Sequence, residues 1–373
     1  MRTRRRGLVA AAALTALALA GCSAPQQGGS GNGGGTDADA EVPSSITMVV
    51  PFAAGGGTDT WARFIAPYFQ DAVEGSPQVV VENVEGGESI TGANQYVTSG
   101  GTDGAQILVA SGSTYLPYLL NRAEVQYDFT KLIPIMVNGT GGAVYVSSST
   151  GITSASDLAD YDGELVYGGI SATGNDLIAL LAMDVLDAPM TATFGFEGRG
   201  PARLALERGE VNVDYQTTSA YLTQVQPMID DGTATPLFSF GVLEDGEIVR
   251  DPALPDLPTL EEVYEEINGS APSGDAYDAY RAFLAAGQFY QKGMWVNEGT
   301  PDSVVQAYRD ATDVLSNDDE FNAASEEFLG GYPLVSGADV QEDLEEAFDI
   351  SDNVRQYTLD LLANDYDVTI DTK

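Results

Sequence analysis

Three short segments rich in Gly, Ser and Thr each follow an apolar run and precede a helical pattern. They are residues 53–59 (AAGGGTD), 111–114 (SGST) and 170–176 (ISATGND). A helix N-terminus has unpaired backbone N–H groups and about half a positive charge, glycine lets a ligand approach the backbone, and hydroxyls add donors. Loops of this kind that meet in one cleft would bind a carboxylate or a phosphate without a cationic side chain. A single glycine-rich loop is common between a strand and a helix, so the prediction depends on the presence of three such loops.

The composition removes most enzyme chemistry. The 373 residues contain no histidine and one cysteine, which excludes Ser-His-Asp and Cys-His catalysis, internal disulfides, His-ligated metal sites and Cys-cluster zinc or iron–sulfur sites. No GxxxxGK[ST] motif is present, which excludes a Walker-type ATPase. Acidic residues number 56 against 16 basic ones, and the net charge of −40 argues against nucleic acid and against docking on an anionic membrane. We expect neither a metal nor a cofactor; the acidic runs lack EF-hand spacing, and calcium binding stays open as an alternative for them.

The N-terminal residues indicate export. Residues 1–21 combine an arginine-rich start with a short apolar stretch and are predicted to be a signal peptide. They end in Leu-Ala-Gly before Cys22, a pattern that resembles the bacterial lipobox, in which the cysteine receives the lipid. Residues 22–44 have the composition of a flexible tether. We therefore expect an extracytoplasmic chain that is lipid-anchored at Cys22 to the outer face of the bacterial cell membrane; the alternative is a plain cleaved signal peptide with an incidental cysteine.

Strand-like and helix-like patterns alternate along the rest of the chain. Strands are predicted at 46–52, 79–83, 107–111, 143–146, 165–169, 191–196, 211–214 and 235–242, and residues 300–373 are predicted to be mainly helical. This alternation favours an α/β fold with largely parallel sheets. No second low-complexity linker interrupts it, so we expect two lobes joined by crossing strands. Lobe 1 would comprise 46–144 plus 266–373, and lobe 2 would comprise 145–265.

The helix after the first loop has an apolar face that begins at Trp61. Thr58 or Asp59 is the expected N-cap, and Asp59 has a second interpretation as a ligand contact. Pro67 lies inside this pattern and is expected to kink or end the helix.

A set of motifs, in order along the chain, resembles a known family. They are VVPFAAGGGTD at 49–59, VVEN at 80–83 with Gly86 and Gly87, Tyr167-Gly168, the glycine-rich segment 198–211, DPALPDLPT at 251–259 and Gly-Thr-Pro at 299–301. Together they are similar to the solute-binding receptors of tripartite tricarboxylate transporters, the Bug family. The resemblance implies a two-lobed type II periplasmic-binding-protein fold with the ligand cleft between the lobes. It also implies closure on a small organic anion, often a carboxylate, and delivery to a membrane permease with one large and one small subunit.

The resemblance also implies ligand-binding residues, motif by motif. They come from the first loop, from the loop after the third strand and from the opposite lobe: Phe52, Ala53, Gly55, Gly56 and Asp59; Ser111, Ser113 and Thr114; Ser171, Thr173 and Asn175. Arg199, at a helix start, is a further candidate that could form a guanidinium–carboxylate fork with the ligand. The alternative for Arg199 is a surface arginine that pairs with one of the many acids, and this alternative is favoured.

The chain departs from the family pattern in places that affect the substrate. Val84-Glu85 replaces a basic residue and a proline, Asn212 replaces an aspartate, residues 264–292 form a longer segment, and Arg199 and Arg203 stand where small or apolar residues are usual.

The function expected from these features is binding and not catalysis. The chain would be a monomeric solute-binding receptor that contacts the membrane only through its lipid. Three alternatives remain: a phosphate or other oxyanion receptor using the same loops, a ligand-sensing lipoprotein that feeds a signalling partner, and a hydrolase that uses two carboxylates.

Overall fold

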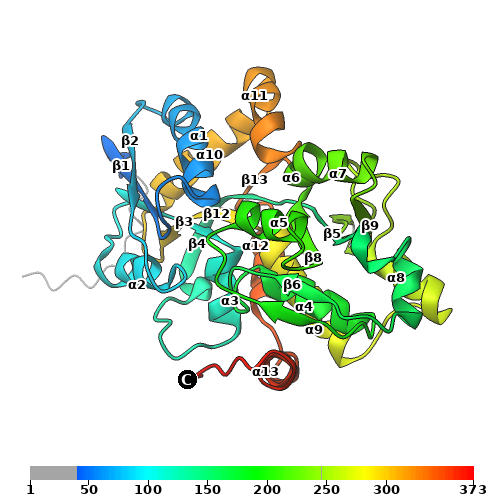
Figure 1. The fold of residues 1–373 in the computed structure, drawn as a ribbon. Helices are drawn as coiled ribbons and strands as arrows, with labels where there is room; N and C mark the ends of the chain where they lie inside the picture. Colours follow the sequence, from blue (N-terminus) through cyan, green and yellow to red (C-terminus); the bar gives the residue numbers. More distant parts are fainter. Residues whose placement is uncertain (1–39, 245) are drawn as a thin grey trace, which may run out of the picture. The chain divides into compact units, whose positions relative to one another are not determined.

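The computed structural model describes residues 40–244 and 246–373 (Figure 1). The predicted signal peptide, Cys22 and most of the predicted tether at 22–44 lie outside the described residues. Within the described part of the chain, none of the helices has the length and apolar character needed to cross a membrane.

The first of two main sheets has six strands in the order β13-β4-β12-β3-β1-β2. Its strands are β1 (Ser45–Val50), β2 (Gln78–Asn83), β3 (Gln106–Ser111), β4 (Leu132–Asn138), β12 (Lys292–Asn297) and β13 (Leu334–Ser336). β1 runs parallel to β2 and β3, whereas β12 runs antiparallel to β3 and β4. The loops after β1 and β3 therefore leave the same edge of this sheet.

The second sheet has five strands in the order β7-β6-β8-β5-β9. They are β5 (Gly142–Ser147), β6 (Val166–Gly168), β7 (Thr191–Thr193), β8 (Val213–Thr217) and β9 (Ala234–Ser239), and β10 (Val242–Glu244) pairs separately with β11 (Glu247–Val249). β6, β7 and β8 are parallel, while β5 is antiparallel to both of its neighbours.

Helices bury both faces of the first sheet. α1 (Gly57–Ala72) and α10 (Asp302–Ser316) cover one face, and α2 (Ile90–Ser99) and α3 (Gly112–Leu119) lie on the other. α4 (Asp176–Val185) is almost entirely apolar and buried, and α9 (Asp275–Leu284) packs on it. The remaining helices are α5 (Arg199–Glu207), α6 (Thr218–Ala220), α7 (Gln226–Asp230), α8 (Leu260–Asn268), α11 (Asp319–Leu329), α12 (Gln341–Phe348) and α13 (Asp352–Asp365). Two π-helical turns, Tyr221–Val225 and Ala285–Phe289, follow α6 and α9.

The expected α/β fold is confirmed, but the expectation of largely parallel sheets is wrong. β4, β12 and β13 were not predicted. They form half of the first sheet, and β4 is antiparallel to both β12 and β13. β12 pairs with strands that lie more than a hundred residues earlier, so no local pattern marks its neighbours.

The expected N-cap of α1 and the expected end of the helix at Pro67 are also wrong, while a kink there stays a prediction. The helix begins at Gly57, with Gly56 at the N-cap position and no capping side chain, so Thr58 and Asp59 lie in the first turn. Pro67 neither ends nor interrupts the helix, which continues to Ala72. Pro67 lies on the exposed side of α1, as does Arg63 one turn earlier, so water can satisfy the carbonyl that loses its helical hydrogen bond.

The chain passes from the first sheet to the second through residues 139–141 and returns through α8, α9 and β12. α9 lies in the returning segment but packs on α4, which connects strands of the second sheet. One apolar core contains residues of both regions. The lobe boundaries at 144/145 and 265/266 therefore stay predictions.

Candidate ligand-binding site

The first predicted loop connects β1 to α1 and is held by Asp59. Asp59 Oδ2 accepts hydrogen bonds from the Gly55 N–H (2.7 Å) and from Arg63 Nε (3.0 Å). Its Oδ1 accepts from Asn83 Nδ2 (2.9 Å), which also donates to the Phe52 carbonyl (3.0 Å). Burial alone would raise the pKa of Asp59, but the bonds from Arg63, Gly55 and Asn83 outweigh it and lower the pKa. Asp59 therefore holds the loop in place as an ionised group.

The same loop has open backbone at its tip. Ala53 and Gly55 are exposed, and a Cβ built on Gly55 or Gly57 would meet no atom within 4 Å. Gly55 has a φ of 82°, a conformation that glycine adopts without strain. Gly56 closes the turn, since its N–H donates to the Ala53 carbonyl (3.2 Å). This loop, with Phe64 and Phe328 beside it, also lines a shallow cavity of about 560 Å³.

The second predicted loop begins α3. Ser111 and Thr114 form a capping box, in which the Ser111 N–H donates to Thr114 Oγ1 (3.3 Å). Thr114 is fully buried, so its hydroxyl supports the helix. The Ser113 carbonyl accepts from Ser89 Oγ (3.2 Å), which ties this loop to the start of α2.

The third predicted loop is organised by Asp176, the first residue of α4. Asp176 Oδ2 accepts from the N–H groups of Ile170 and Ser171, both at 3.0 Å. Asp176 Oδ1 accepts from the Tyr167 hydroxyl at 2.6 Å. The loop that carries Ser171, Thr173 and Asn175 is thus fixed before any ligand arrives.

The second and third loops meet, as expected for loops of one cleft. A Cβ on Gly112 would lie 2.3 Å from Asn175 Oδ1, and a Cβ on Gly174 would lie 3.4 Å from Ser113 Oγ. Asn175 Nδ2 donates to the Gly287 carbonyl (3.2 Å), and its Oδ1 has no hydrogen-bond partner among the described residues.

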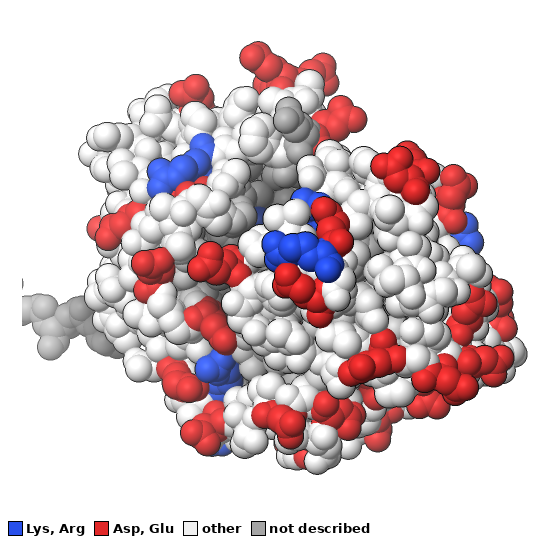
Figure 2. Space-filling view, viewed as in Figure 1, with Lys and Arg blue, Asp and Glu red and all other residues white. Residues whose placement is uncertain are grey.

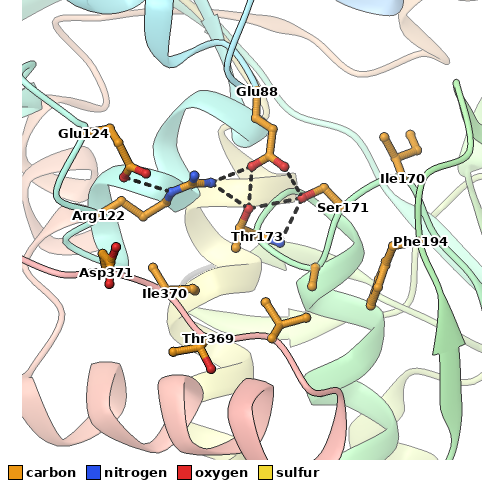
Figure 3. Close-up of a pocket in the computed structure, with 12 residues that line it drawn as sticks. Glu88, Arg122, Glu124, Ile170, Ser171, Thr173, Phe194, Thr369, Ile370 and Asp371 are labelled. Carbon is orange, nitrogen blue, oxygen red and sulfur yellow. Dashed lines mark hydrogen bonds and ion pairs between the residues drawn. The ribbon is translucent and has the colours of Figure 1, made fainter.

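The hydroxyls of the third loop already hold a carboxylate of this chain, that of Glu88 (Figure 3). Ser171 Oγ donates to Glu88 Oε1 (2.8 Å), and Thr173 Oγ1 donates to Oε2 (2.6 Å). Arg122 Nη1 also donates to Oε2 (2.6 Å). These residues line a cavity of about 350 Å³ beside residues 368–371. Sequence reasoning missed Glu88 and Arg122, although Glu88 directly follows the Gly86-Gly87 pair before α2, which was a signal for a loop of this kind.

Glu88 is placed by an unusual backbone. It has a φ of 56°, and Ser89 follows with a φ of 80°, so two consecutive non-glycine residues are left-handed. Such a conformation costs free energy that other contacts must offset. Burial would raise the pKa of Glu88, but the bonds from Thr173 and Ser171 and the charge of Arg122 lower it. Glu88 is therefore an ionised carboxylate that links the segment before α2 to the third loop.

Arg199 lies in a buried ion-pair network of the second sheet. Its guanidinium lies 3.0 Å from both Asp176 Oδ1 and Asp214 Oδ1 and donates to the Gly168 carbonyl (2.8 Å). It also stacks over the Tyr215 ring, 4.8 Å from the centroid. The expected pairing with acids is present, but the expected surface position is wrong, since the side chain is only 15% exposed.

Burial governs the ionisation of this network. It raises the pKa of Asp214 to about 6, although Arg199 and the Tyr145 hydroxyl act in the opposite direction. Desolvation would lower the pKa of Arg199, but its interactions with Tyr167, Asp176 and Asp214 outweigh this and raise the pKa, so Arg199 stays charged. Through Asp176, Arg199 positions the third loop.

Lys292 is a further residue that sequence reasoning missed. It is the first residue of β12 and is aligned with Ser111 of β3 and Asn138 of β4. The only signal in the sequence is a lysine beside an apolar run in a chain with three lysines, and this signal does not reveal its neighbours. The sheet register places it beside the second loop.

The space-filling view shows the surface hollowed between the region of α1 and that of α5 and α6, with basic side chains at the wall (Figure 2). Acidic side chains cover much of the same face. Among the described residues, no three His, Cys, Asp or Glu side chains are grouped so that they could hold a metal ion.

Two curated proteins are similar in sequence. The UPF0065 protein in the TAR-I ttuE-ttuC' intergenic region of Agrobacterium vitis is 28% identical over 227 residues. That alignment covers 59% of this chain and 61% of the relative, so the chain spans less than two thirds of its length. Protein BugT of Bordetella pertussis is 26% identical over 252 residues, which is 65% of this chain and 71% of BugT. No family model matches the chain.

Solved structures of similar fold cover most of the chain. The periplasmic binding protein BugD has a TM-score of 0.58 and 22% identity, covering 84% of this chain and 95% of its own. A Rhodopseudomonas palustris protein with adipate has a TM-score of 0.61 and 22% identity, and the match covers 84% of this chain and 97% of that protein. MatC from Rhodopseudomonas palustris with bound malate has a TM-score of 0.57 and 20% identity, covering 83% and 98%. These likenesses confirm the expected type II periplasmic-binding-protein fold.

Proposed function

We propose that the chain is an extracytoplasmic solute-binding receptor of the Bug family for a small organic anion, since BugT is similar to it in sequence and BugD in fold. The observation that carries the proposal is the arrangement of the predicted loops. The loops after β1 and β3 leave the same edge of the first sheet, and the loop before α4 meets the second of them at Gly112. In open α/β sheets this edge is where ligands bind.

The bound group is a carboxylate. Helix N-termini and hydroxyls favour anions in general, and Ser171, Thr173 and Arg122 already hold the carboxylate of Glu88. Two proteins of similar fold have adipate and malate in their structures. Both are dicarboxylates, which makes this class the first choice for this chain.

The mechanism is capture without turnover. The ligand enters between the loops, and the two α/β regions close on it about the segments that connect them, at 139–141 and before β12. The receptor then delivers the acid to a membrane permease with one large and one small subunit. The proposal also includes lipidation at Cys22, attachment to the outer face of the bacterial cell membrane and a monomeric state.

The experiment is a thermal-shift screen of the purified chain without its predicted signal peptide. The panel contains malate, adipate, succinate, citrate, benzoate and phosphate. A ligand at about 100 times its dissociation constant stabilises the native state by roughly 2.7 kcal/mol, which raises the melting temperature. Stabilisation by organic acids supports the proposal. Stabilisation by phosphate alone, or by none of the panel, contradicts it.

A further inference from the structure

The start of β12 places a lysine among the predicted ligand loops. Lys292 is aligned with Ser111 and Asn138, so the three side chains lie on one face of the first sheet. Trp61 Nε1 of α1 donates to Asn138 Oδ1 (3.3 Å), which identifies this as the face that α1 covers. Met294, two residues along β12, lies in the same apolar cluster as α1. Lys292 therefore lies at the sheet edge where the loops before α1 and α3 begin.

The charge of Lys292 has no counterion among the described residues. No carboxylate there lies within 4 Å of its Nζ, which donates to the side chain of the neighbouring Gln291. Of the charged groups on the helices that cover this face, Asp59 pairs with Arg63 on α1, and Arg309 of α10 donates to the Pro134 carbonyl. A lysine without a carboxylate partner among the described residues is unexpected in a chain with 56 acidic residues. Burial lowers the pKa of Lys292 to about 8, so the ammonium form predominates at neutral pH.

A polar side chain four residues earlier in the sequence lacks hydrogen-bond partners among the described residues. Gln288 is fully buried, and neither its amide oxygen nor its amide nitrogen has a hydrogen-bond partner among the described residues. Buried amides are normally paired, and an unpaired one calls for an explanation. Gln288 lies in the π-helical turn that leads into β12, and its carbonyl accepts from the Thr140 N–H (2.9 Å) of the other connecting segment. Irregular turns of this kind are frequent at functional sites.

We propose that Lys292 is the anchor of the bound ligand, and that its ammonium group pairs with a carboxylate of the organic acid between the loops before α1 and α3. This inference rests on the proposed function and adds to it the group that neutralises the ligand. An ammonium taken out of water without a counterion costs folding free energy, and an incoming carboxylate removes that cost. The site then combines one full positive charge with the helix N-termini.

The test compares Lys292→Met with the control Lys131→Met. Lys131 is exposed and pairs with Asp128, and it precedes β4 at the end of that strand opposite to Asn138. Calorimetric titration of wild type with malate, adipate, succinate, citrate and benzoate identifies the acid that binds most tightly, and that acid is used for the variants. We expect Lys292→Met to lose about 10- to 100-fold in affinity, as for a charge-assisted hydrogen bond. Lys131→Met should bind like wild type, and equal binding by Lys292→Met overturns the inference.

A pH series separates a lost contact from a damaged fold. Wild-type affinity should fall above pH 8, approaching about tenfold per pH unit as the ammonium group deprotonates. Lys292→Met should show no such fall, and a wild-type profile that is flat from pH 7 to 10 overturns the inference. If wild type binds none of the acids, the proposed function is wrong and the anchor role falls with it. If wild type binds and the variant binds equally, only the anchor role is wrong.

Discussion

Arg199 and Lys292 are two partly buried cations with opposite surroundings. Arg199 of the second sheet region contacts two carboxylates, a carbonyl and an aromatic face. Lys292 of the first sheet contacts a glutamine side chain and no carboxylate of the described residues. The arginine is neutralised by the fold itself, whereas the lysine is not.

The difference separates a positioning role from a binding role. Arg199 holds Asp176, which in turn holds the N–H groups of Ile170 and Ser171. Both terminal nitrogens of Arg199 are already paired with Asp176, Asp214 and the Gly168 carbonyl, so its charge is balanced within the fold. Lys292 has no carboxylate partner among the described residues and is aligned with Ser111 at the end of β3, so a ligand can supply its counterion. Arg199, which the sequence analysis named as a ligand candidate, thus belongs to an ion-pair network within the fold. Lys292, which the sequence analysis did not name, is the better candidate for a ligand contact.

The largest expected effect comes from breaking the Arg199 network. Arg199→Met leaves Asp176 and Asp214 buried without a counterion, so we expect the free energy of unfolding to fall by about 3–5 kcal/mol. Urea denaturation measures this change. The control Arg208→Met removes an arginine that is 59% exposed and pairs with Glu210, itself 56% exposed, so its ion pair contributes only about 0–1 kcal/mol. Equal stabilities of the two variants would contradict the assignment of Arg199 to the fold.

The opposite sign is expected for Lys292→Met in the absence of ligand. The folded-state pKa of Lys292 is about 8 against 10.5 when unfolded, so between these values the unfolded chain binds more protons and stability rises with pH. At pH 7 the charged lysine therefore destabilises the fold, by an amount on the order of 2–3 kcal/mol after allowance for partial exposure. Denaturation at pH 7 should find Lys292→Met more stable than wild type. A loss of stability in the variant would indicate that Lys292 is part of the packed core.

A smaller effect is expected at Glu88, whose carboxylate is 44% exposed. Its pKa is lowered in the fold, so the stability it contributes is present above the unfolded-state pKa of about 4.5 and is lost as pH falls through the folded-state pKa. We expect Glu88→Gln to cost about 1 kcal/mol or less at pH 7, because solvent screens the pair with Arg122. The gap from wild type should narrow below pH 4.5. A gap that is independent of pH would show that the charge of Glu88 contributes nothing.

The sequence predicted those parts of the fold and of the site that depend on residues adjacent in the chain. The glycine-rich turns after β1 and β3 and the helices that follow them were expected from residue types alone. The position of Lys292 depends on β12 pairing with strands from a distant part of the sequence, and no periodicity marks that register. Glu88 depends on two left-handed residues that are not glycine, which composition does not signal. The burial of Arg199 depends on Asp176 and Asp214, which come from separate elements.

The most direct test is a crystal structure of the protein with the organic acid that binds most tightly. We expect a carboxylate oxygen of the acid within hydrogen-bond distance of Lys292 Nζ, with Arg199 still paired to Asp176 and Asp214. An acid that pairs with Arg199, or one that leaves Lys292 bonded only to Gln291, would contradict the assignment of the two cations.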